Sequence, residues 1–82
     1  MNEINILFET VGDINSTYPY LCIYDKKDQI NPFMEIAITN DKQLQYIIYA
    51  GTRDITLTTE DWDYIRKKAQ DFFAWTLANV ET

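Results

Sequence analysis

The stretch that decides the fold is FMEIAITNDKQLQYIIYA, residues 33–50. Two segments within it, residues 33–39 and 43–50, are rich in β-branched and aromatic side chains. The polar residues 40–42, Asn-Asp-Lys, separate the two segments and form a short connection. Two such segments joined by a short polar connection predict a β-hairpin.

A pairing of Thr39 with Gln43 gives this hairpin a definite register, because side chains alternate between the two faces of a strand. The register places three apolar pairs on one face: Ile38 with Leu44, Ile36 with Tyr46, and Met34 with Ile48. The other face then carries a mixed set: Phe33, Glu35, Ala37, Gln45, Ile47 and Tyr49. This second face is neither a clean core nor a clean solvent side.

Strand patterns also occur on both sides of the hairpin. Residues 2–10 and 18–25 are predicted strands, and residues 11–17 between them are rich in turn-forming types. Residues 54–57 predict a short fifth strand. We expect an antiparallel meander of four or five strands, in which the pairing order of the first two strands stays open.

One helix is predicted over residues 59–80. Thr58 is a suitable N-cap residue, and Asp61 follows three residues later in a near capping box. Apolar residues and one threonine then recur at spacings of three and four: Trp62, Ile65, Ala69, Phe72, Phe73, Thr76, Leu77 and Val80. This stripe should cover one sheet face in an α+β domain, so truncating Trp62 or Phe72 to alanine should endanger the fold.

Composition narrows the class of protein. The chain has 82 residues, enough for a single domain (residues 1–82), and 46% of them are hydrophobic, as in a packed domain. Seven basic and thirteen acidic residues give a net charge of −6, which disfavours binding to nucleic acid and favours a basic protein partner. The alternative is that the acidic surplus only maintains solubility. No signal peptide or membrane-spanning apolar run is recognisable, so we expect a cytoplasmic protein without membrane contact.

The residue types that most enzymes use are scarce. The chain has no histidine, and its one cysteine, Cys22, lies in an apolar run typical of a small buried residue. The acidic clusters are Asp25 with Asp28, and Glu60 with Asp61 and Asp63. Both lie in predicted loop or helix-cap positions, where a carboxyl group is too exposed for general acid chemistry. We therefore expect no catalytic residue, no cofactor and no metal site.

Two surfaces remain as candidates for partner binding. One helix covers only one sheet face, so the other face would expose a set that is apolar for a solvent side: Tyr20, Cys22, Tyr24, Glu35, Ala37, Gln45, Ile47 and Tyr49. Such a face would bind a partner or a second copy. The alternative is a register shifted by one residue, which would make these residues the core.

The second candidate surface lies on the helix, opposite the apolar stripe. It carries Tyr64, Lys68, Asp71 and Trp75. Exposed aromatic residues concentrate binding energy at interfaces, so Trp75 beside Tyr64 is a plausible contact surface. The alternative is that a loop or the N-terminal strand folds over these rings. The predicted partner-binding residues of both surfaces are Tyr20, Tyr24, Glu35, Ile47, Tyr49, Tyr64, Asp71 and Trp75.

Three segments, residues 32–38, 46–50 and 57–62, followed by Ile65, Ala69 and Phe72, give the chain a family likeness. In this pattern it resembles small bacterial immunity proteins of polymorphic-toxin and contact-dependent inhibition systems. The resemblance implies a cytoplasmic, non-catalytic inhibitor that binds one cognate toxin domain, often a nuclease. A homodimeric structural or accessory protein, and a phage-encoded inhibitor of a host nucleic-acid enzyme, are the alternatives.

Overall fold

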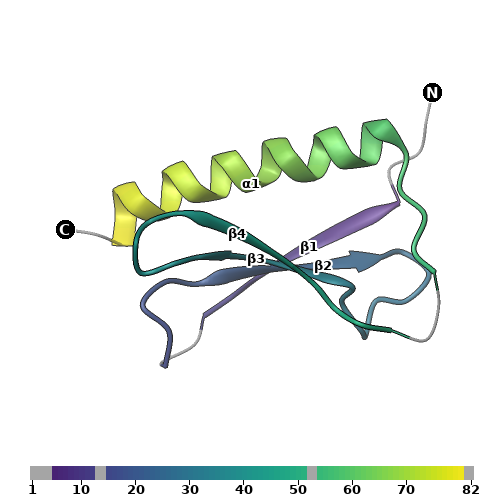
Figure 1. Ribbon diagram of the computed structural model, residues 1–82, viewed down its shortest axis with the longest axis horizontal. Coiled ribbons are helices and arrows are strands. Elements are labelled where there is room, and N and C mark those ends of the chain that lie inside the picture. Colours follow the sequence, from purple (N-terminus) through teal and green to yellow (C-terminus); the bar gives the residue numbers. More distant parts are fainter. Residues whose placement is uncertain (1–4, 13–14, 52–53, 81–82) are drawn as a thin grey trace.

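The computed structural model describes residues 5–12, 15–51 and 54–80. Its elements are β1 (Ile6–Val11), β2 (Tyr20–Asp25), β3 (Met34–Ile38), β4 (Leu44–Ile48) and α1 (Thr59–Val80). The strands form one antiparallel sheet in the order β1-β2-β3-β4, and α1 lies across one face of it (Figure 1). This arrangement confirms the predicted α+β meander with a C-terminal helix, and it settles the order of the first two strands.

The β3–β4 hairpin has the predicted register. Ile38 pairs with Leu44, Ile36 with Tyr46, and Met34 with Ile48. The Thr39 N–H donates to the Gln43 carbonyl at 2.9 Å, and the Lys42 N–H donates to the Thr39 carbonyl at 2.9 Å. Lys42 closes the turn with a φ of 64°, a left-handed conformation that non-glycine residues seldom adopt.

The core lies between the sheet and α1, because alternate residues of the inner strands point toward the helix. In β3 these are Met34, Ile36 and Ile38, all buried. They pack with further buried residues of the sheet, the loops and the helix: Ile6, Tyr18, Leu21, Ile23, Phe33, Ile65, Ala69 and Phe72. A register shifted by one residue is therefore wrong, since Met34, Ile36 and Ile38 are buried as predicted. Their cross-strand neighbours Tyr46 and Ile48 were predicted on the same face, but on the edge strand they are 40% and 72% exposed.

The capping box at the start of α1 is confirmed. The Asp61 N–H donates to Thr58 Oγ1, and the Thr58 N–H donates to Asp61 Oδ2, each at 3.0 Å. The helix then presents Ile65, Ala69 and Phe72 to the core, as the spacing predicted. These reciprocal bonds satisfy backbone donors that a helix start otherwise leaves unpaired.

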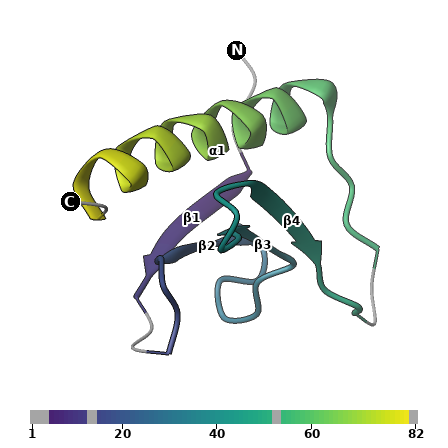
Figure 2. The ribbon, with the colours of Figure 1, turned by 60° about the vertical axis from the view of Figure 1, so that its left-hand side comes forward.

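Two predictions about this region are wrong. Residues 54–57 form no fifth strand; they belong to the link between β4 and α1 (Figure 2). Ile55 and Leu57 of this link pack on the core. Trp62, which was predicted to pack on the sheet as part of the helix stripe, is 45% exposed. It lies at the margin of the stripe, where the centroids of its ring and the Tyr46 ring are 6.4 Å apart.

The predicted strand at residues 2–10 begins at Ile6, and its residues 2–4 lie outside the described residues.

Candidate protein-binding surface

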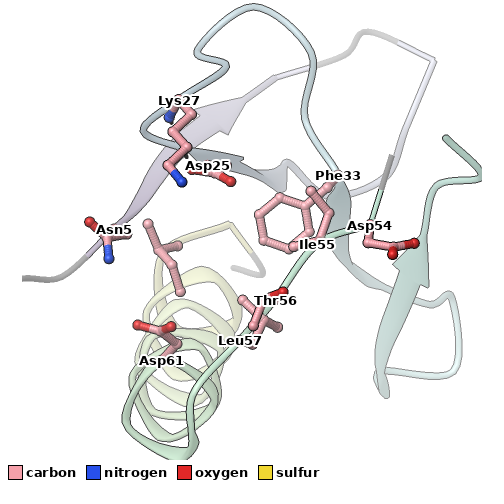
Figure 3. Close-up of a pocket in the computed structure, with 10 residues that line it drawn as sticks. Asn5, Asp25, Lys27, Phe33, Asp54, Ile55, Thr56, Leu57 and Asp61 are labelled. Carbon is pink, nitrogen blue, oxygen red and sulfur yellow. Dashed lines mark hydrogen bonds between the residues drawn. The ribbon is translucent and has the colours of Figure 1, made fainter. Parts of the chain in front are cut away.

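A cavity of about 170 Å³ lies where β1, the residue 54–57 link and the start of α1 meet (Figure 3). Of the three carboxylates that line it, two are engaged in local structure: Asp61 caps α1, and Asp25 Oδ1 accepts the Lys27 N–H at 2.9 Å. The neighbouring Asp28 accepts the N–H groups of Ile30 and Asn31 in the same way. These acids organise turns and a helix end.

The part of the chain that the structure describes lacks two further kinds of site. Within it, no three histidine, cysteine or acidic side chains come together in a way that could hold a metal ion. Within it also, no helix combines the length and the apolar character that crossing a membrane requires.

The sheet face directed away from α1 is termed here the open face. Cross-strand register places one row of residues across all four strands on this face: Glu9, Cys22, Glu35 and Ile47. The other open-face residues are Leu7, Val11, Tyr20, Tyr24, Ala37, Gln45 and Tyr49. No helix or strand among the described residues packs over this face, since α1 lies on the other side (Figure 2).

Two tyrosines on the open face are held by glutamates of neighbouring strands. The Tyr24 hydroxyl donates to Glu9 Oε1 at 2.8 Å, and the Tyr49 hydroxyl donates to Glu35 Oε1 at 2.5 Å. The hydrogen bond to Glu9 raises the pKa of Tyr24 to about 12, and the bond to Glu35 raises the pKa of Tyr49. Both phenols are therefore neutral donors at pH 7, and their rings are fixed on the sheet.

Cys22 occupies the middle of the open face, between the two glutamates. It is only 7% exposed, as expected for a small apolar residue. Burial, together with the negative charges of Glu35 and Glu9, raises the pKa of the thiol, so the reactive thiolate is disfavoured. The centre of the open face thus holds a protonated, apolar thiol, with a carboxylate on each side.

The structure brings together the five sheet residues that the sequence singled out. Tyr20, Tyr24 and Glu35 are half-buried on the open face, while Ile47 and Tyr49 are exposed there. Glu9 belongs to the same surface, but sequence reasoning missed it. The signal that could have found it is the β1–β2 pairing, which puts Glu9 opposite Cys22.

The three helix candidates, Tyr64, Asp71 and Trp75, lie on a separate surface. Tyr64 packs edge-on against Phe8 of β1, with ring centroids 5.3 Å apart, so the N-terminal strand does cover this ring in part. Trp75 stays 61% exposed. It borders a shallow groove of about 410 Å³ whose other lining residues are Thr10, Leu21, Lys68, Asp71 and Phe72.

The two predicted surfaces thus lie on opposite sides of the sheet, and a flat partner surface cannot contact both at once. The open face combines carboxylates with fixed aromatic rings, whereas the α1 flank offers one exposed tryptophan beside a small groove.

Comparison of the chain with protein-family models, with curated proteins and with solved structures finds no match.

Proposed function

We propose that this protein is a non-catalytic inhibitor that binds a basic protein partner through the open face. The observation that carries the proposal is the pair of tyrosine–glutamate hydrogen bonds, Tyr24 to Glu9 and Tyr49 to Glu35, on a sheet face over which no described helix or strand packs. The partner class that we propose is a toxin domain, as the resemblance to immunity proteins implies. Inhibition of such a toxin would take place in the cytoplasm.

Preorganisation supports this proposal. A tyrosine that is already held in place loses little conformational freedom when it becomes buried in an interface, so more of its contact energy contributes to affinity. Tyr24 and Tyr49 are held by short bonds to the sheet. Their rings therefore suit the role of anchors at the centre of an interface.

Charge supports a basic partner. Each bonded glutamate uses Oε1 for a tyrosine, and its Oε2 bonds to no described residue. A free carboxylate oxygen is an acceptor for arginine or lysine, and such charge-assisted bonds are stronger than neutral ones. The net charge of −6 would also speed encounter with a basic surface at low salt. Nuclease toxins have basic substrate clefts, which makes them suitable targets.

The first experiment is capture of the partner by tagged protein in lysate of the source cells, followed by measurement of affinity between the purified proteins. Glu35→Gln should weaken binding about tenfold or more, because it removes a carboxylate from the centre of the surface. Asp41→Asn changes the net charge equally but alters an exposed turn residue, so it should leave affinity nearly unchanged. Inhibition of the partner's activity should fall in parallel with affinity.

Trp75→Ala distinguishes the two surfaces. Under this proposal the substitution has little effect on affinity, because Trp75 lies on the other side of the sheet from Glu35. A large loss with Trp75→Ala and none with Glu35→Gln would move the binding site to the flank of α1. Capture of an acidic partner, or of one whose activity is unchanged by the complex, would contradict the inhibitor function itself.

A further inference from the structure

The outer edge of β4 is a second unpartnered feature, distinct from the open face. β4 ends the sheet order. Gln43 and Tyr49 bond to β3-side partners: the Thr39 N–H donates to the Gln43 carbonyl, and the Tyr49 N–H donates to the Phe33 carbonyl. The antiparallel alternation then directs the backbone groups of residues 44, 46 and 48 away from β3.

These outward backbone groups have no partner among the described residues. The edge also lacks the usual protection against strand pairing, which consists of charged side chains, proline or a bulge. β4 reads LQYII and is the one strand of the four without a charged residue, and its register with β3 continues without a break. By contrast, Lys68 and Tyr64 of α1 cover Phe8 on the β1 edge.

Apolar exposure is concentrated at the same edge. Ile48 is 72% exposed and Tyr46 is 40% exposed, although both point to the side of the sheet on which α1 lies. Trp62 of α1 contacts Tyr46 and is itself half-exposed. An edge strand with unpaired backbone groups and a border of large apolar side chains is suited to the addition of another strand.

We propose that a second copy of this chain pairs its β4 antiparallel with this β4, about a twofold axis at Tyr46. The pairing is self-complementary. Tyr46 faces Tyr46 of the second copy, and Leu44 faces Ile48 of the second copy. All three outward residues then exchange backbone hydrogen bonds, as a twofold-symmetric interface requires.

Charge favours a second copy over a charged peptide as the occupant. Residues 43–49 contain no charged side chain, so two such segments face each other without like-charge contacts, despite the net charge of −6 on each chain. An added strand of Lys or Arg residues would find no carboxylate on β4. The same uncharged, apolar sequence on the second copy matches both the backbone pattern and the side chains.

This dimer does not depend on the proposed function. Pairing about an axis through Tyr46 extends the sheet from four strands to eight, with both helices on one side. The two open faces then lie together on the other side and stay accessible. Partner binding through the open face and dimerisation through the β4 edge can therefore succeed or fail separately.

The test is the molar mass in solution, measured by sedimentation over protein concentrations from micromolar to millimolar. Wild type should approach twice the protomer mass as concentration rises. Ile48→Pro removes an outward N–H but no bond to β3, so it should raise the dimer dissociation constant at least tenfold while far-UV circular dichroism stays unchanged. Ile48→Ala keeps the N–H and should have a smaller effect. Ile30→Ala removes a loop isoleucine that is even more exposed, at 84%, and should have no effect.

Amide hydrogen exchange on wild type keeps the test independent of how the proline variant folds. In the dimer, the amides of Leu44, Tyr46 and Ile48 should exchange at least tenfold more slowly at high protein concentration than at low concentration. A protein that stays monomeric at millimolar concentration would overturn the proposal. So would a dimer whose three outward amides exchange as fast as in the monomer, or one that Ile48→Pro leaves intact.

Discussion

The covered face and the open face of this sheet are built from alternate residues of the same strands, yet they differ in how their side chains are satisfied. Under α1, the side chains of Leu21, Ile23, Met34 and Ile36 on the two inner strands are almost completely buried. On the open face, tyrosine hydroxyls bond to glutamates that remain in contact with solvent. The covered face stabilises the fold by removing apolar surface from water. The open face holds polar groups in place, where a partner that buries this face could bond to them.

The largest expected effect is a difference in the free energy of unfolding when one isoleucine on each face is truncated. Ile36→Ala on the covered face should lower the free energy of unfolding by about 2 to 5 kcal/mol, because Ile36 is fully buried. Ile47→Ala on the neighbouring strand should lower it by about 1 kcal/mol or less, because Ile47 is already 36% exposed. Urea denaturation followed by circular dichroism measures both values. Equal losses would show that the open face is also packed in solution.

The helix start is the next point at which the covered face can be weakened. Asp61→Ala removes the bond from the Thr58 N–H to Asp61 Oδ2, although the backbone N–H of residue 61 can still donate to Thr58 Oγ1, and should cost about 0.5 to 1.5 kcal/mol of unfolding free energy. Asp63→Ala is the control, since Asp63 is an exposed residue of the same turn whose 3.8 Å ion pair with Arg66 contributes little. A loss at Asp63 as large as that at Asp61 would mean that helix-dipole charge dominates over capping.

A buried polar atom under the covered face marks a position at which a substitution should stabilise the fold. Thr76 is fully buried, and its Oγ1 has no hydrogen-bond partner among the described residues. Thr76→Val replaces this hydroxyl with a methyl group of similar size and should raise the free energy of unfolding by about 1 kcal/mol. Thr76→Ser keeps the hydroxyl, loses a methyl group and should destabilise. The melting temperatures of the two variants should therefore change in opposite directions, and a drop for valine would contradict the unsatisfied state of Oγ1.

The smallest effect concerns the open face and its pH dependence. The bond to Glu9 raises the pKa of Tyr24 to about 12 in the folded state, above the unfolded value of about 10. The stabilisation from this bond is therefore complete below pH 10 and is lost as the pH rises from 10 through 12. Titration of tyrosine absorbance near 295 nm should show this delayed ionisation. Glu9→Gln should return the Tyr24 pKa toward 10, and an unchanged titration would refute the bond.

Short-range features were predictable because the residues that make them are close in the chain. The three-residue connection after Thr39 determines which residues of β3 and β4 face each other, so the hairpin register followed from the pattern. The Thr58–Asp61 capping box spans four residues and was equally predictable from the sequence. The separation of five open-face residues from the core followed from the same register, since strand residues alternate between faces.

Features that depend on where elements lie in space were not predictable. Trp62 fits the helical spacing of the core, but it lies over the edge strand β4 beside Tyr46 and therefore stays half-exposed. Residues 54–57 have a strand-like pattern but lie in the link to α1. A local pattern cannot show whether a neighbouring strand is available to pair with such a segment.

By itself, the sequence determined the α+β class, the hairpin register, the helix start and the division of strand residues between two faces, because each depends on neighbours within a few residues. Only the tertiary structure decided that β1 pairs with β2, which brings Glu9 beside Cys22 and Tyr24, and that β4 forms a bare edge. Contacts between residues far apart in the chain depend on how whole elements pack. Local periodicity contains no information about that packing.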